Sequence, residues 1–238
     1  MVESEGRRAG SSQMSVAAAN FTDMSAPWTT ALASVAEQLN GNRIEWMLLG
    51  SAATALRGAA IVPGDIDIAL LTADDVTRAA SVLPTPDAPE PVESDELVPS
   101  DWISTAAEPT LHFGHSGERW TFGRWFIDGV KVELAHIDAP AVAALMIETR
   151  APLVWHERKT LNCHDQPVPT VPVEVQLATM ISRQQDARID ATIAAIDTTL
   201  LNLTLLRRAI SDKRSEVPAM TVPESLQRLL EDAQTATD

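Results

Sequence analysis

The hydrophobic positions of the chain follow a helical spacing first and a strand spacing afterwards. Between Trp28 and Leu39, apolar residues recur every three to four positions, which is the pattern of a helix with one buried face. Ser25 is placed to cap this helix, Pro27 suits its first turn, and Gly41 suits its end. We therefore expect an amphipathic helix at this point.

A compact strand, turn, helix and strand follow. The apolar run Glu45 to Leu49 predicts a buried strand, and Gly50-Ser51 breaks it where an alanine-rich helix from Ala52 to Arg57 can begin. Pro63-Gly64 ends a loop, and the alternating run Asp65 to Leu71, DIDIALL, predicts a second strand.

The rest of the chain predicts further strands and then helices. Asp128-Gly129 is a strong hairpin signal, and the prolines between residues 84 and 101 indicate an exposed loop that could act as a lid. The predicted elements are a helix capped by Thr72, strands at Thr110–Phe113, Arg119–Phe126 and Val130–Ile137, a helix at Ala141–Glu148 capped by Asp138, a hairpin of Leu153–Trp155 with Thr160–Asn162, and helices at Val175–Ile181 and Ile189–Ile210.

The chemistry of the chain is expected on the strand of the two aspartates. Residues two apart on a strand share a face, so Asp65 and Asp67 point the same way while Ile66 and Ile68 point into the core. Two such close carboxylates repel each other unless a cation lies between them. The Gly-Ser turn leaves free amide groups at a helix start, which suits a phosphate, and oxygen ligands beside a phosphate favour Mg²⁺. The alternative is a solvated strand face without function.

The stretch from Trp46 to Leu71 resembles the DNA polymerase β-type nucleotidyltransferase superfamily. The signature of that superfamily is an apolar strand, Gly-Ser or Gly-Gly, a short helix, and Asp-x-Asp on the next strand, and Gly50, Ser51, Asp65 and Asp67 match it. The run is most similar to the toxin-type branch of type IV toxin–antitoxin and abortive-infection systems, and next to the small antibiotic nucleotidyltransferases.

The resemblance implies an α+β fold with a polymerase β-like mixed sheet flanked by helices and followed by a C-terminal helical region. We expect a disordered tail at residues 1–24, a nucleotidyltransferase domain at 25–165 and the helical region at 166–238. The family's site also takes a third acidic residue from a later strand. Glu133 is the best candidate, because it shares the polar face of its strand with Lys131, although the family more often has Asp.

Two Mg²⁺ ions are implied by the same resemblance. Asp65 and Asp67 would bridge them, and Glu133 would ligate one ion, act as the base, or both. Gly50 and Ser51 would hold the β- and γ-phosphates of a nucleoside triphosphate. The expected sources of counter-charge to those phosphates are Arg57, Lys131 and Arg183.

Arg183 is a candidate because the toxin-type families have a short apolar helix, then a basic residue, and an acidic residue three positions later. Asp186 is that acidic residue here, and Arg stands where the family usually has Lys. A plain ion pair on a helix surface is the alternative for Arg183 and Asp186.

Three classes of function remain open at this point. The first is a toxin-like enzyme that transfers a nucleotide to tRNA and has an antitoxin partner. The second is an enzyme that modifies a small hydroxylated molecule, such as an antibiotic, or a protein. The third is a nucleotide-binding module without catalysis.

Composition points to a cytoplasmic protein that works in high salt. The formal charge is −15, with 33 acidic and 18 basic residues. Only 3 of the basic residues are Lys, and the sequence contains no Tyr. Such acidity disfavours nucleic acid in dilute buffer, but surface charges are screened within about 3 Å at 1 M salt.

The single cysteine, Cys163, agrees with a reducing cytosol and excludes an internal disulfide. The adjacent His164 has no second cysteine with it, which disfavours zinc. Residues 1–24 have no convincing apolar core, which favours a tail over a signal peptide, and no apolar run approaches the length of a membrane span.

Overall fold

The computed structural model describes residues 24–84, 102–115, 117–138 and 152–235. The expected N-terminal tail, nearly all of the proline-rich loop and the predicted helix at 141–148 therefore lie outside the described residues.

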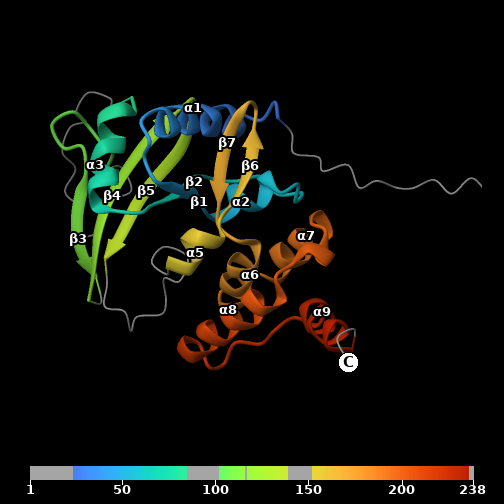
Figure 1. The fold of residues 1–238 in the computed structure, drawn as a ribbon. Coiled ribbons are helices and arrows are strands. Elements are labelled where there is room, and N and C mark those ends of the chain that lie inside the picture. The colour runs from blue at the N-terminus through green and yellow to red at the C-terminus, as the bar shows by residue number, and fades with distance from the viewer. Residues whose placement is uncertain (1–23, 85–101, 116, 139–151, 236–238) are drawn as a thin grey trace, which may run out of the picture.

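The described residues form a sheet with helices on both sides (Figure 1). The strands are β1 (Trp46–Leu48), β2 (Ile66–Leu70), β3 (Leu111–His115), β4 (Glu118–Ile127), β5 (Val130–Asp138), β6 (Lys159–Cys163) and β7 (Gln166–Thr170). The helices are α1 (Pro27–Gly41), α2 (Gly50–Leu56), α3 (Ala73–Val82), α5 (Pro152–Glu157), α6 (Val173–Ser182), α7 (Asp186–Ala195), the 3₁₀ turn η2 (Thr198–Leu200), α8 (Leu203–Glu216) and α9 (Glu224–Thr235).

The seven strands form one sheet in the order β3-β4-β5-β2-β1-β7-β6. Its directions are mixed, because β2 runs parallel to β5 and β1 runs parallel to β7, while the other neighbours are antiparallel. The prediction of an α+β fold with a mixed, helix-flanked sheet is confirmed. The central position of β2 places the Asp-x-Asp strand between β1 and β5.

One face of the sheet is covered by α1 and α3, and the helices α6 to α9 gather on the side of the molecule away from α1 (Figure 1). The apolar face predicted for α1 is buried, including Leu32, Val35 and Leu39 at 0% exposure. Ile66 and Ile68 of β2 are buried in the same core, so the intervening Asp67 is directed to the opposite face. The alternation of β2 thus assigns its carboxylates to the face that α1 and α3 leave open.

Two local signals in the sequence have the predicted structure. The side chain of Thr72 accepts a hydrogen bond from the Asp75 amide at 3.1 Å and caps α3. Asp128 and Gly129 both have positive φ, 51° and 76°, and join β4 to β5 in a tight hairpin. This hairpin fixes the register between β4 and β5, and the parallel pairing of β5 with β2 sets Glu133 opposite Asp67.

Three predicted elements differ in the structure. Residues 153–155 belong to the helix α5, and the last hairpin is formed by β6 and β7. The predicted long helix from Ile189 to Ile210 is divided, because Ile196 is extended and the side chain of Asn202 caps a new helix, α8. The sheet also continues past residue 165, since β7 lies between β1 and β6.

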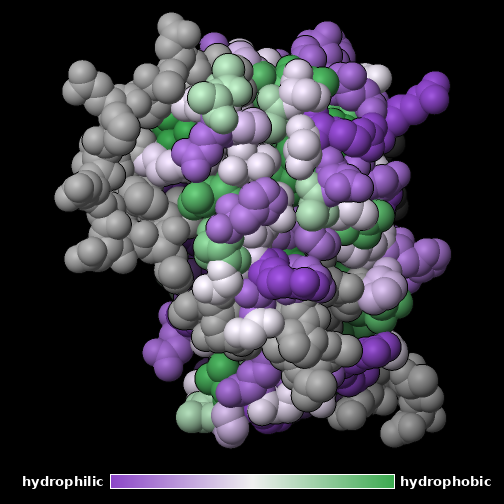
Figure 2. All heavy atoms as spheres, turned by 90° about the vertical axis from the view of Figure 1, so that its left-hand side faces the viewer, coloured by the Kyte–Doolittle hydropathy of each residue, from purple (hydrophilic) through white to green (hydrophobic). Residues whose placement is uncertain are grey.

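The outer surface at the β3 edge is mixed in character. Figure 2 views the side of the molecule that carries α3 and β3, and hydrophilic and hydrophobic residues are interspersed over its described part. Among the described helices, none combines the length and apolar character that crossing a bilayer requires.

Candidate metal and nucleotide site

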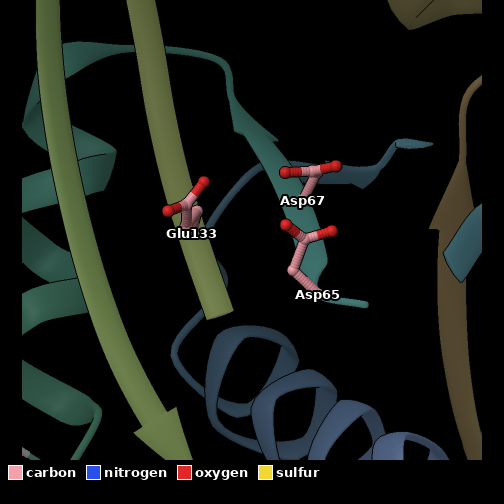
Figure 3. Close-up of side chains that lie close together, drawn as sticks. All are labelled: Asp65, Asp67 and Glu133. Carbon is pink, nitrogen blue, oxygen red and sulfur yellow. The ribbon is translucent and has the colours of Figure 1, made fainter. Parts of the chain in front are cut away.

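Three carboxylates meet where β2 lies beside β5 (Figure 3). Asp67 is the register partner of Glu133, and Asp65 lies one step before β2 on the same face. One carboxylate oxygen from each of Asp65, Asp67 and Glu133 lies within 4.8 Å of the others. The expected convergence of Glu133 on the aspartate pair is therefore confirmed as geometry.

Gly50 is required by the shape of this site. Its φ is +61°, in the left-handed region, and a Cβ at this position would collide with the Asp67 carboxylate. The Leu49 amide also donates to the Asp67 carbonyl oxygen at 2.8 Å. The Gly-Ser turn and the Asp-x-Asp strand are thus in direct contact, which accounts for the glycine in the motif.

Two cations face the carboxylates. Lys131 Nζ lies 3.0 Å from Asp65 Oδ2 and 3.4 Å from Glu133 Oε1. Arg124 Nε donates to Glu133 Oε1 at 2.7 Å, and its side chain is nearly buried. Three negative groups therefore meet two positive ones, and the cluster keeps an excess of negative charge.

Arg124 was not among the predicted site residues. It is the register partner of Glu133 on β4, so its side chain shares the face of the carboxylates. The signal was available in the Asp-Gly hairpin, because counting outward from that turn pairs residue 124 with residue 133.

Burial and the neighbouring carboxylates together change the pKa of Asp67. Burial, followed by the charges of Asp65 and Glu133, raises the pKa of Asp67 from 3.8 to about 6, against the opposing effect of Lys131 and Arg183. For Lys131, burial lowers the pKa, but the hydrogen bonds and charges of Asp65 and Glu133 outweigh it and the net pKa is raised. Asp67 is therefore the carboxylate with the most to gain from an added cation.

A cavity of about 240 Å³ opens beside the carboxylates, between the open face of the sheet and the end of α6. Gly50, Asp67 and Glu133 line it on one side, and Arg183 and Arg188 line it on the other. Within the described ranges, neither guanidinium forms an ion pair. The cavity thus has carboxylates at one wall and two available cations at the other.

The turn between α6 and α7 places these two arginines. The Gln185 amide donates to the Met180 carbonyl and the Gln184 amide to the Ile181 carbonyl, both at 3.0 Å, with Gln184 at a φ of 55°. Arg183 follows the last residue of α6 and Asp186 is the first residue of α7. Arg183 and Asp186 therefore do not share a helix face. Arg188 also lines the cavity and was not predicted from the sequence.

Arg57 does not have the expected place. Its guanidinium donates to Gln176 Oε1 at 2.7 Å, to the Ala53 carbonyl at 2.8 Å, and to the Val171 carbonyl. Burial lowers its pKa to about 10, which leaves it charged at neutral pH. Arg57 ties α2 to the start of α6, so we withdraw it as a source of counter-charge for a nucleotide.

The remaining predicted residues divide between the cavity and its rim. Gly50 and Arg183 line the cavity, whereas Ser51 and Lys131 do not. Ser51 is largely buried at the start of α2, and Lys131 lies on the outer side of the carboxylates, against Asp65.

Comparisons with known proteins find distant similarities of structure, two of which follow. No protein-family model matches the sequence, and no curated protein matches it. A protein from Thermotoga maritima is similar in structure, and its name assigns it provisionally to the nucleotidyltransferases. The two sequences are 15% identical and the TM-score is 0.45, over 70% of this chain and 91% of that chain. An antigenic nucleotidyltransferase-like protein from Paracoccidioides brasiliensis is 17% identical with a TM-score of 0.44, covering 85% and 91%. Because both scores lie below 0.5, we base the functional proposal on the residues of the site.

Proposed function

We propose that this protein is a Mg²⁺-dependent nucleotidyltransferase, which moves a nucleoside monophosphate from a nucleoside triphosphate to an acceptor hydroxyl. The observation that carries the proposal is the convergence of Asp65, Asp67 and Glu133 within 4.8 Å, directly against the Gly50 turn. Paired carboxylates occur on many strands, but here they lie against a turn at a helix start, a place that suits a phosphate group.

The donor set fits Mg²⁺. All three groups offer carboxylate oxygens, which are the ligands this ion prefers, and burial together with the charges of Asp65 and Glu133 raises the pKa of Asp67. Bound Mg²⁺ would supply charge neutralisation at the α-phosphate and at the leaving pyrophosphate. Asp65, Asp67 and Glu133 are the residues that would hold it.

The phosphates of the nucleotide are expected at the start of α2. The first amide groups of a helix have no acceptor within the helix, and Gly50, the first residue of α2, lies directly against the Asp67 carboxylate. Arg183 and Arg188 face this position across the cavity and can neutralise phosphate charge. Binding and orientation of the triphosphate follow from these groups.

The transfer forms a bond from the acceptor oxygen to the α-phosphorus and breaks the bond from the α-phosphorus to the bridging oxygen, releasing pyrophosphate. The hydroxyl proton must leave as the new bond forms, and Glu133 is the carboxylate placed to accept it. Arg124 restricts the rotation of Glu133 through its 2.7 Å hydrogen bond, which keeps the receiving oxygen in place.

The test is transfer of label from two forms of each nucleoside triphosphate, one labelled at the α-phosphate and one at the γ-phosphate. The purified protein is incubated with Mg²⁺ and cell extract, and the extract is then separated into RNA, protein and small molecules. We expect the α label in one fraction and no γ label in any of them. Asp65→Asn should lose this transfer, while Asp128→Asn, in the exposed β4–β5 turn, should keep it.

Transfer of the γ label would identify a kinase-type reaction and refute the proposal. Binding of the nucleotide without any label transfer would identify a non-catalytic module instead. Label in the tRNA fraction would support the toxin-type assignment, for which a co-purifying antitoxin would be the expected partner. Label in the small-molecule or protein fraction would support the second acceptor class.

A further inference from the structure

The cavity at the carboxylates continues along the sheet onto a row of aromatic rings. Trp120 and Phe122 of β4 line the cavity, and Phe113 of β3 is the register partner of Trp120. We call Phe113, Trp120 and Phe122 the aromatic face. These three side chains lie on the same face of the sheet as Arg124 and Glu133, because they follow the same alternation.

The Trp120 ring is held in place on two sides. Phe113 stacks against it, with ring centroids 5.6 Å apart and an interplanar angle of 15°. Its indole nitrogen donates to Glu118 Oε2 at 3.0 Å. Trp120 is only half-buried, so it is a fixed aromatic ring with accessible surface toward the cavity.

Phe122 connects this face to the catalytic cluster. The Arg124 guanidinium lies 5.4 Å from the centroid of the Phe122 ring, within the range of a cation–π contact. The same guanidinium donates to Glu133. The aromatic face and the third carboxylate are therefore joined through one side chain.

The cavity beside the rings is small. The sheet side between the rings and Asp67 is formed by Ala69 and Ala135, whose methyl groups leave the surface open. Its volume of about 240 Å³ is below the roughly 300 Å³ at which sites for drug-sized ligands begin. The part of the cavity along β4 and β5 is the space available to an acceptor ring.

The aromatic face lies on the acceptor side of the site. The attacking and leaving oxygens of a phosphoryl group in transfer lie roughly in line, on opposite sides of the phosphorus. The turn expected to hold the leaving phosphates precedes α2 and borders β1, whereas the aromatic face is on β4, across β5 from Asp67. The attacking hydroxyl therefore approaches from the side of β4.

From this geometry we infer that the aromatic face binds a planar heteroaromatic ring of the acceptor, with Trp120 as the principal stacking residue. The inference rests on the proposed nucleotidyl transfer and specifies its acceptor. At about 3.3 Å per residue along the strand, Phe122 lies roughly 7 Å and Trp120 roughly 13 Å beyond the row of Glu133. A ring carried next to the reacting hydroxyl, as in a nucleoside or a nucleotide end, matches this spacing.

A row of aromatic side chains on a sheet usually belongs to the hydrophobic core. Phe122, which is 7% exposed, fits that interpretation. The interpretation does not account for Trp120, which borders the cavity and is held in a single orientation. Trp120 is therefore the residue to change.

The experiment measures binding of adenosine by titration calorimetry, with Mg²⁺ and a non-hydrolysable nucleoside triphosphate analogue present to fill the nucleotide site. Adenosine is a general probe, because every base offers a face for stacking. We expect Trp120→Leu to weaken adenosine binding by about 5- to 150-fold, the range for loss of one base–aromatic stack. Trp120→Phe should retain most of the affinity, and ribose without a base should not bind.

Trp102→Leu is the matched control. Trp102 packs on Phe122, with ring centroids 5.9 Å apart, but does not line the cavity, so its loss should leave adenosine binding unchanged. The affinity for the nucleotide analogue alone should also be equal in wild type and Trp120→Leu. A short oligoribonucleotide that binds more tightly than adenosine, with the same dependence on Trp120, would identify an RNA end as the source of the ring; equal affinities would identify a free nucleoside.

Two results would overturn the inference. One is adenosine binding that is absent, or equal in wild type and Trp120→Leu. The other is a fall in affinity for the nucleotide analogue in Trp120→Leu, which would assign the ring site to the donor nucleotide. Label transfer tests the proposed reaction separately. If transfer is intact but either of these two results is found, only the acceptor site is refuted. If adenosine binding depends on Trp120 but no label is transferred, only the proposed reaction is refuted.

Discussion

Replacing Asp67 with Asn should stabilise the metal-free protein at neutral pH, although it removes a residue of the proposed site. Asn has the size of Asp and no charge. In the native protein, burial and the carboxylates of Asp65 and Glu133 disfavour the ionised form of Asp67 and raise its pKa to about 6. An unfolded chain has neither effect. Ionisation of Asp67 therefore favours the unfolded state.

The sign and size follow from the two pKa values. Below pH 3.8, Asp67 is protonated in both states and contributes no difference. Between pH 3.8 and about 6, the native state binds the proton more tightly, so the free energy of unfolding falls as the pH rises and levels off above about 6. A shift of about 2 pKa units corresponds to about 3 kcal/mol, or about 6–12 °C in melting temperature for a chain of this size.

Urea denaturation of EDTA-treated protein at a series of pH values measures this effect. Asp67→Asn should exceed wild type by up to about 3 kcal/mol at pH 8, and the difference should shrink toward zero near pH 4. Asp128→Asn, at an exposed turn position whose φ of 51° Asn tolerates, serves as the control and should show no such trend. With Mg²⁺ added, wild type should gain stability and Asp67→Asn should not. An Asp67→Asn protein less stable than wild type at pH 8 without metal would refute the charge argument.

Three further changes test other parts of the structure. Gly50→Ala puts a Cβ against the Asp67 carboxylate at a φ of +61°, so it should abolish Mg²⁺ binding in calorimetry, while Gly64→Ala, with open space around it, should not. Gln184→Gly relieves a left-handed non-glycine residue and should raise the free energy of unfolding by about 0.5–1 kcal/mol in urea; a loss of stability would show that the side chain is needed. With 33 acidic against 18 basic residues, the protein should melt higher at about 2 M than at about 0.1 M KCl, and an unchanged melting temperature would exclude adaptation to salt.

The central elements of the site were predictable because their signals are local. Alternation in DIDIALL decides that Asp65 and Asp67 share a face, and alternation in its own strand puts Glu133 on the polar face with Lys131. These inferences need only strands of a few residues. The convergence of the three carboxylates within 4.8 Å also depends on the parallel pairing of β5 with β2, which was expected only from the resemblance to the polymerase β-type family.

The parts that were missed depend on contacts far apart in the sequence. Arg57 ends a short helix whose start was expected to bind phosphate, and only the approach of Gln176 and Val171 commits its guanidinium to the protein interior. Arg188 is one of several arginines in the C-terminal half, and only the turn at Gln184 directs it to the cavity. No periodicity in the sequence distinguishes such residues from solvated ones.

The segment that follows residue 165, β7 and α6, is joined directly to the site. Strand β7 pairs with β1 at Leu48, two residues before Gly50. Beyond β7, Gln176 of α6 donates to the Gly50 carbonyl at 2.5 Å and to Thr54 Oγ1 at 2.8 Å. The helix α6, which Arg183 directly follows, is therefore fastened to the Gly50 turn by buried hydrogen bonds. Since breaking buried polar contacts of this kind costs about 1–3 kcal/mol each, α6 and the turn should move as one unit, with both walls of the cavity already in place before a nucleotide binds.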